Sequence, residues 1–243
     1  VLYNMGVLST ILTILVILIV LYLILHYFFS SSSSLTTMQD ATERQVVEAS
    51  TLKNNSNTSN YTYSTWFYVD DWNYRFGEPK ILLTRLDQDQ NPSPSIVLGA
   101  MENNITISVS CYPQNQTTGV TSNTSIVHKC TIENFPLQAW VNLIISLYGR
   151  TLDVYVDGKL VRTCVLPGVA KVNPNSNLQV TPGGGFSGYT SNFEYWDDAT
   201  NPQQAYNIYK SGFGGSQIGN LFNQYRIQVN FLNNGIVEGS FEV

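Results

Sequence analysis

The amino-acid sequence predicts an all-β protein, a sandwich or jelly roll with one short helix, preceded by a single transmembrane α-helix. Three observations lead to this fold class. Residues 7–29 form an uncharged apolar run, apolar and polar residues alternate with a period of two from Tyr61 onward, and turn residues interrupt the alternation about every 8 to 12 positions. Many short strands of this kind pack as two sheets around one core.

The apolar run, VLSTILTILVILIVLYLILHYFF, carries no formal charge at pH 7. A helix of this length spans roughly 35 Å, enough to cross a hydrocarbon core of ~30 Å. A cleaved signal peptide is the alternative, but no basic residue precedes the run and no small-residue cleavage site follows it. We expect residues 1–29 to form a membrane anchor with its span at 7–29. Its orientation stays open because Arg44 is the first basic residue after it.

A polar linker is expected at residues 30–60, which begin with SSSSS and end with NNSNTSN. Such segments bury too little apolar surface to offset their ordering entropy. A short helix over residues 38–50 is one interpretation of the middle of this stretch. The β domain is then expected at 61–243, with its last hairpin within 213–243.

The strands follow from alternation between turn residues. In Trp140–Tyr148, four apolar residues share one face, and Asp157-Gly158 supplies the positive φ angles of a tight hairpin turn. The expected strands are Tyr63–Val69, Lys80–Arg85, Ser95–Met101, Ile105–Cys111, Ile126–Ile132, Trp140–Tyr148, Thr151–Val156, Leu160–Cys164, Asn177–Thr181, Gly188–Tyr195, Tyr225–Phe231 and Ile236–Phe241.

One helix is predicted in PQQAYNIYKS. Asn201 can cap its first turn, Pro202 suits the first helical position, and Gly212 can end it.

Composition argues against nucleic acid as a partner. The formal net charge is -5, and the 12 Lys and Arg residues are scattered along the chain. Phosphate binding relies on clustered basic side chains.

Three segments together resemble the laminin-G-like, concanavalin A-like superfamily of lectins and glucanases. They are YSTWFYVDDW (63–72), AWVNLIISLYGRTLDVYVDGKLV (139–161) and GGGFSGYTSNFEYWDDATNPQQAYNIYKSG (183–212). The second is similar to the family's signature hairpin, and the order of the three is that of the family. The resemblance covers about 60–212 and implies a jelly-roll sandwich.

A narrower resemblance concerns the whole layout. An N-terminal span, a polar linker, this domain and the phrase NPQQAYNIYKSGFGG are similar to virion-associated, minor capsid proteins of large DNA viruses that infect algae and protists. In such viruses an internal membrane lies beneath an icosahedral capsid.

The three cysteines match neither a zinc spacing nor a redox motif. Two interpretations stay open. All three are small core residues, or Cys111 and Cys130 form a disulfide across adjacent strands and Cys164 is left over.

Catalysis is not expected, because the sequence lacks the E-x-D-x-x-E strand with which retaining glucanases of this fold hold two carboxylates about 5 Å apart. The acidic group Glu194, Asp197 and Asp198 is more typical of loops and caps. His128 lies in a predicted strand without the motif of a nucleophile.

Binding residues are easier to name. Asp70, Asp71, Asp87 and Asp89 are candidate calcium ligands, although no defined loop spacing supports them, so no cofactor is expected beyond that ion. Trp72 and Trp196 are candidate platforms for a sugar or a protein partner. Six sequons occur, at Asn54, Asn57, Asn60, Asn104, Asn115 and Asn123, and they become glycosylation candidates if the domain is luminal or extracellular.

These features predict a non-enzymatic, membrane-anchored structural or binding protein. The preferred hypothesis is a minor capsid protein that tethers an internal viral membrane, its lipid partner, to capsid proteins. The alternative is a lectin-like protein that displays a glycan-binding domain on a membrane or cell surface. A glucan hydrolase using Glu194 and Asp197 is the third hypothesis.

Overall fold

The computed structural model describes residues 15, 17–20, 34–52, 58–113, 125–213, 228–233 and 236–242. The chain divides into two compact units. One comprises Ser34–Phe213, and the other comprises Val1–Ser33 with Gly214–Val243.

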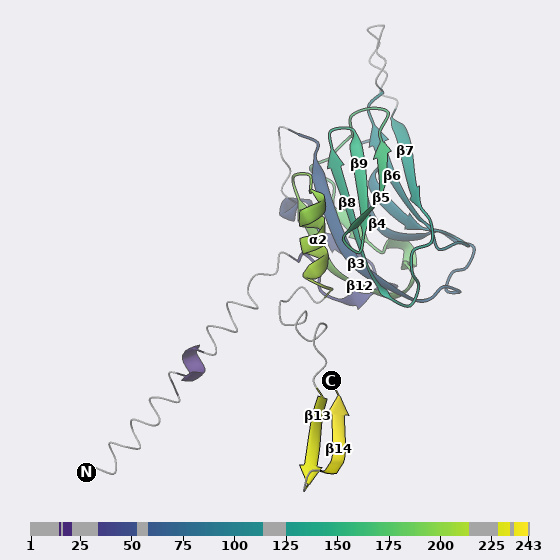
Figure 1. The fold of residues 1–243 in the computed structure, drawn as a ribbon. Coiled ribbons are helices and arrows are strands. Elements are labelled where there is room, and N and C mark those ends of the chain that lie inside the picture. Colours follow the sequence, from purple (N-terminus) through teal and green to yellow (C-terminus); the bar gives the residue numbers. More distant parts are fainter. Residues whose placement is uncertain are drawn as a thin grey trace. The chain divides into compact units, whose positions relative to one another are not determined.

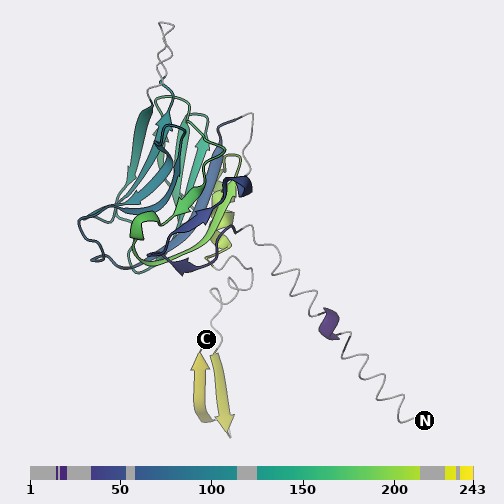
Figure 2. The ribbon, with the colours of Figure 1, turned by 180° about the vertical axis from the view of Figure 1, so that it is seen from behind.

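The Ser34–Phe213 unit is a sandwich of two six-stranded antiparallel sheets (Figures 1 and 2). Sheet A has the order β1 (Gln39–Asp40), β12 (Ser187–Trp196), β3 (Tyr61–Asp71), β8 (Trp140–Tyr148), β9 (Thr151–Val156) and β10 (Lys159–Val165). Sheet B has the order β2 (Gln45–Val47), β11 (Leu178–Val180), β4 (Lys80–Leu86), β5 (Pro92–Leu98), β6 (Ile105–Cys111) and β7 (Ile126–Ile132). Two 3-10 turns, η1 (Ala49–Thr51) and η2 (Pro182–Gly184), lie in the connections.

The core lies between the sheets, where alternate residues of each strand point inward. Val141, Leu143, Ile145 and Leu147 of β8 are all buried at 1% exposure or less, so the predicted inward face is confirmed. The hairpin turn after β9 is confirmed too, with φ of 50° at Asp157 and 71° at Gly158.

Helix α2 (Pro202–Lys210) is the predicted short helix, and it packs on the outer face of sheet A (Figure 1). Asn201 accepts a hydrogen bond from the Gln204 backbone N–H, and the Gln204 side chain accepts one from the Asn201 N–H. This capping box satisfies donors that the first turn would leave unpaired. Ala205 of the helix is buried against Ile144 and Tyr155 of the sheet.

Residues 34–52 correct the expectation of a polar linker through 30–60. They form the short strands β1 and β2 and the turn η1, and they contribute Ala41, Val47 and Leu52 to the core. No helix forms over 38–50. The segment is ordered because β1 pairs with β12 and β2 pairs with β11, so strands already in place satisfy its backbone groups.

Most of the expected span at 7–29 lies outside the described residues. Within the described part of the chain, no helix is long and apolar enough to cross a membrane. In the unit that comprises Val1–Ser33 and Gly214–Val243, β13 (Gln228–Asn233) and β14 (Ile236–Glu242) pair as the predicted hairpin. This hairpin forms its own two-stranded sheet, so the sandwich ends at 213 and not at 243.

The sandwich begins and ends beside the same short part of β12. The Leu35 N–H donates to the Phe193 carbonyl at 2.7 Å, and the Ser191 hydroxyl donates to the Phe213 carbonyl at 2.6 Å. The Phe213 ring stacks on Trp140 with 4.5 Å between ring centroids. In sheet A, β12 lies next to the β1 edge, and β10 forms the opposite edge.

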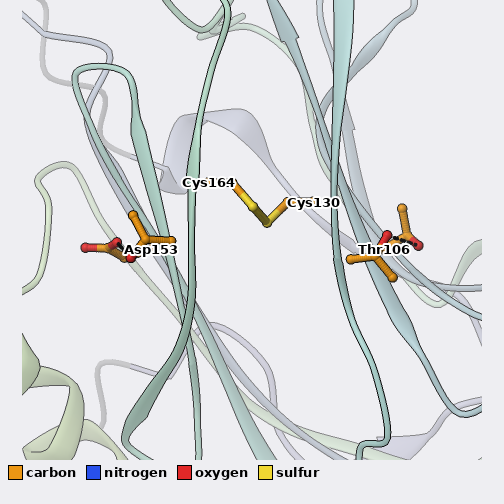
Figure 3. The surroundings of a disulfide bond; sticks show 6 residues. Thr106, Cys130, Asp153 and Cys164 are labelled. Atoms are coloured by element: carbon orange, nitrogen blue, oxygen red, sulfur yellow. Dashed lines mark hydrogen bonds between the residues drawn. A yellow bond between two sulfur atoms is a disulfide. The ribbon is translucent and has the colours of Figure 1, made fainter.

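A disulfide joins the two sheets at that opposite edge (Figure 3). It links Cys130 of β7 to Cys164 of β10, and Cys111 is free and buried. The structure thus contradicts both interpretations of the sequence: the cysteines are not three unbonded core residues, and Cys130 does not pair with Cys111. In the pairing of β6 with β7, Cys111 lies opposite Ile126 and Cys130 lies opposite Ile107, so these two cysteines are not cross-strand neighbours.

Candidate functional site

A groove next to Trp72 is the first candidate site. Trp72 directly follows β3, and its indole N–H donates to the Met101 carbonyl at 3.2 Å. Its ring packs edge-on against the buried Phe135, with 5.8 Å between centroids. The Lys80 ammonium lies 4.5 Å from the ring centroid. Burial, and then the nearby Arg75 charge, lower the pKa of Lys80. Trp72 is thus held in one orientation.

Three connections meet around this indole: the segment after β3, the β5–β6 loop and the β7–β8 loop. Asn103 ties the two loops together, because its side chain donates to the Phe135 carbonyl at 2.8 Å and its carbonyl accepts from the Phe135 N–H at 3.1 Å. The groove has a volume of about 610 Å³ and is lined by Trp72, Met101, Glu102, Asn103, Asn104, Glu133, Asn134 and Leu137. This size suits a small ligand or a short chain segment.

The chemistry of the groove is that of a binding surface. Met101 is 66% exposed and Leu137 is 36% exposed, so apolar surface flanks the indole. Three amides and two carboxylates supply donors and acceptors around it. The sequence predicted the Trp72 platform but not the rest of the lining, because its residues come from loops that only the folded topology brings together.

The second platform, Trp196, lines a smaller groove of about 350 Å³ at the start of α2. Asp197, Asp198, Thr200 and Gln204 lie in the same groove. Asp198 is committed to local structure, since its carboxylate accepts from the Ala199 N–H at 2.7 Å and from the Asn60 side chain at 3.4 Å.

The four calcium candidates do not come together. Asp70 and Asp71 end β3, before the connection to β4, whereas Asp87 and Asp89 follow the far end of β4. Asp71 accepts from the Asn73 N–H, and Asp87 accepts from the N–H groups of Asp89 and Asn91.

Asp89 forms an ion pair with Lys171 at 3.0 Å. Within the described residues, no three His, Cys, Asp or Glu side chains gather as a metal site.

Glu194, Asp197 and two further aspartates lie in different local environments. Glu194 is buried in β12 with 7% exposure, and Asp197 lies in the exposed turn after that strand. Asp153 accepts from the Thr163 hydroxyl at 2.6 Å, and Asp157 accepts from the Asn142 N–H at 2.9 Å. His128 lies partly buried in β7. Asp153 thus supports the pairing of β9 with β10, and Asp157 supports the β9–β10 turn.

Two of the six sequons fall within the described residues. The Asn60 side chain accepts from the Gly149 N–H at 2.9 Å, and the Asn104 side chain lies against Gly99 and donates to Glu102 at 3.4 Å. Asn54, Asn57, Asn115 and Asn123 lie outside the described residues.

Comparison with known families agrees with this architecture. Residues 41–205 match the profile of the concanavalin A-like lectin/glucanases superfamily. The chain belongs to this superfamily. The match begins between β1 and β2 and ends within α2, so β2 is part of the superfamily domain. No curated protein sequence matches the chain.

Solved structures with this superfamily fold include the binding domains of botulinum neurotoxins. The serotype D domain has 12% sequence identity and a TM-score of 0.52, and the similarity covers 70% of this chain and 40% of that one. The neurotoxin DC domain in complex with rat synaptotagmin II has 12% identity and a TM-score of 0.50, with 69% and 40% covered. The same domain in complex with SialylT has 12% identity and a TM-score of 0.50, with 69% and 39% covered. The chain thus spans about 40% of these domains, and the likeness shows a shared fold.

Proposed function

We propose that this protein is a non-enzymatic, membrane-anchored binding protein in which the sandwich holds a partner and residues 7–29 insert into a bilayer. In its specific form the proposal is a minor capsid protein that tethers an internal viral membrane to the inner face of the capsid. The tether works through hydrophobic insertion at one end and protein contact at the other.

One observation carries the binding role. Asp153, Asp157 and Asp198 accept hydrogen bonds from neighbouring N–H and hydroxyl groups, while Trp72 is fixed in an open groove with apolar and amide surface. Aromatic and methionine side chains are enriched in protein interfaces. The neurotoxin domains of similar fold, which occur in complexes with rat synaptotagmin II and with SialylT, support a binding role.

The virion part rests on the resemblance of the chain's layout and of the NPQQAYNIYKSGFGG phrase to capsid-associated proteins. Mass spectrometry of purified particles, before and after stripping with detergent, tests it. We expect the protein in intact particles, together with release of the chain only when the membrane is dissolved. Absence from intact particles would refute the capsid role and leave the anchored binding role to be tested by alkaline extraction of membranes.

The second candidate is glycan binding in the Trp72 groove, which is favoured by an indole surrounded by amides and carboxylates. A sugar ring can stack on the indole while its hydroxyls bond to the polar side chains. On a glycan array, Trp72→Ala should abolish the signal, whereas Trp196→Ala should leave it unchanged. Calcium should make no difference if the four aspartates act only in turns. No specific glycan signal from the unmodified protein would remove this candidate.

A further inference from the structure

The two sides of the sandwich are protected very differently. On one side the outermost strands are β1, of 2 residues, and β2, of 3 residues. On the other side they are β7 and β10, of 7 residues each. Among the described residues, β10 pairs with β9 alone and β7 pairs with β6 alone. An outermost strand presents a row of unpaired N–H and C=O groups, and short outer strands are one way in which proteins limit that exposure.

The β10 edge also carries exposed apolar side chains. Leu160 is 48% exposed, Val161 47% and Val165 65%. Across the disulfide, Ile126 and Val127 of β7 are 41% and 38% exposed. A long outer strand with apolar side chains is the kind of surface to which another extended segment adds by strand pairing.

The charge of this edge is opposite to that of the whole chain. Lys129 of β7 and Lys159 and Arg162 of β10 are exposed, although the net charge is -5. The ion pairs of the described residues involve Arg75 and Lys171 and none of these three side chains.

Asp153 of the neighbouring strand β9 bonds to Thr163 on the side away from the disulfide (Figure 3). Asp157 of the β9–β10 turn interacts with Lys159, so Lys129 and Arg162 are the basic side chains of this edge that have no carboxylate partner among the described residues. The edge is therefore complementary to an acidic segment.

We propose that the β10 edge binds an extended acidic segment of another protein, which adds as a strand to sheet A. The proposal rests on the binding role proposed above and names the chemistry of the partner. The Cys130–Cys164 bridge holds β10 in place, so little ordering is needed on binding. A second copy of this chain fits poorly, because antiparallel pairing about the centre of β10 sets two Arg162 side chains opposite each other.

The test uses the full chain in detergent micelles and a capped seven-residue peptide of alternating Glu and Val, matched in length to β10. Fluorescence anisotropy should show binding that is at least about tenfold tighter than that of the corresponding Lys-Val peptide. The double variant Lys159→Glu and Arg162→Glu should reverse this preference. The control Arg44→Glu makes the same kind of charge change at an exposed position beside the short strands and should keep it.

A third peptide, the Glu-Val sequence N-methylated at alternate residues, tests strand pairing. It keeps the charge but loses the N–H donors on one edge, so its binding should be lost. Equal binding of the methylated peptide would overturn strand addition. The proposal would be overturned if the Glu-Val peptide did not bind, or if Arg44→Glu weakened its binding as much as the double variant does. It would also be overturned if light scattering showed self-association with which the peptide competes. None of these outcomes depends on the presence of the chain in particles, so the capsid role fails or stands separately.

Discussion

Arg85 is a buried arginine that joins three parts of the sandwich. It is 1% exposed, and its guanidinium donates to the Tyr63 hydroxyl at 3.1 Å, the Ser176 carbonyl at 3.0 Å and the Pro174 carbonyl at 3.3 Å. Arg85→Met fills similar space but donates nothing, which leaves these acceptors without the donor. We expect the free energy of unfolding to fall by about 3 kcal/mol, measured by urea denaturation.

Arg85→Lys is the matched control for this prediction. It keeps the positive charge but cannot reach three acceptors with a planar fork, so its loss should be similar to that of the methionine variant or only slightly smaller. If Arg85→Met were as stable as the unmodified protein, the cost of burying the charge would already cancel its hydrogen bonds.

Asp157 gives the sandwich a dependence on pH whose sign can be worked out. Burial raises the pKa of this carboxyl, and the Asn142 N–H and Lys159 lower it only in part. Its folded pKa lies above the unfolded value, so its contribution to stability is present at low pH and lost as the pH rises through the folded pKa. Asp157→Asn keeps an acceptor and suits the φ of 50°. We expect about 0.5 kcal/mol of added stability at pH 7, small because the site is partly exposed, and none near pH 3.

Asp40 supplies the opposite sign. The Thr42 hydroxyl and then the Thr42 N–H hold the pKa of Asp40 below its usual value. Asp40→Asn should therefore reduce stability at pH 7, and this difference should shrink as the pH falls through the folded pKa of Asp40. Denaturation curves of the two variants at pH 7 and pH 3 check both signs, and a parallel response of the two would contradict the assignment.

At the scale of elements, local sequence was sufficient for several strands of seven to nine residues, whereas the longer β3 and β12 were predicted too short at both ends. The bounds Ile105–Cys111, Ile126–Ile132 and Trp140–Tyr148 were predicted to the residue, because alternation over seven or more positions leaves one consistent face. The start of β5 was placed too late, since Pro92 and Pro94 normally argue against a strand. Strands β1 and β2 were missed because a segment of two or three residues is too short to show an alternation of apolar and polar side chains. They form because they pair with β12 and β11, which lie far along the chain.

The contact between α2 and the β9–β10 turn gives a prediction at this scale. A Cβ added at Gly158, where φ is 71°, would lie 2.9 Å from the Tyr209 Cβ and 3.1 Å from the Tyr206 Cα. Gly158→Ala should thus strain the turn and displace the helix, at a cost of about 2–3 kcal/mol. Gly149→Ala is the control, because φ there is 58° and nothing lies within 4 Å, so only the backbone strain of about 1 kcal/mol remains. Thermal unfolding followed by circular dichroism measures both, and equal losses would show that the helix contact contributes nothing.

At the scale of the whole molecule, sequence reasoning found the fold class but not the geometry between the sheets. The Trp72 platform was predicted as a single residue, whereas the groove depends on three loops that meet at one end of the sandwich. The cysteine pairing failed for the same reason. Alternation shows that Cys130 points inward, but only the order of strands in both sheets shows that β7 and β10 are outermost on the same side.

The Cys130–Cys164 bridge ties the sheets together across their open edge, which gives the last prediction. It closes a segment with a sequence separation of 34, and constraint of the unfolded chain by such a loop stabilises the fold by up to about 4 kcal/mol. Dithiothreitol should therefore lower the melting temperature of the unmodified protein, but not that of Cys130→Ala with Cys164→Ala.

The melting temperature of Cys111→Ala should respond to dithiothreitol as that of the unmodified protein does, because Cys111 is free and forms no part of the bridge. A melting temperature that is insensitive to reductant would mean that the sheets are held by core packing alone. The expected sensitivity would instead require that the sandwich mature on the oxidising side of a membrane or with an oxidising folding system. Since the bridge also positions β10, reduction should weaken binding of the Glu-Val peptide and lower stability in the same titration.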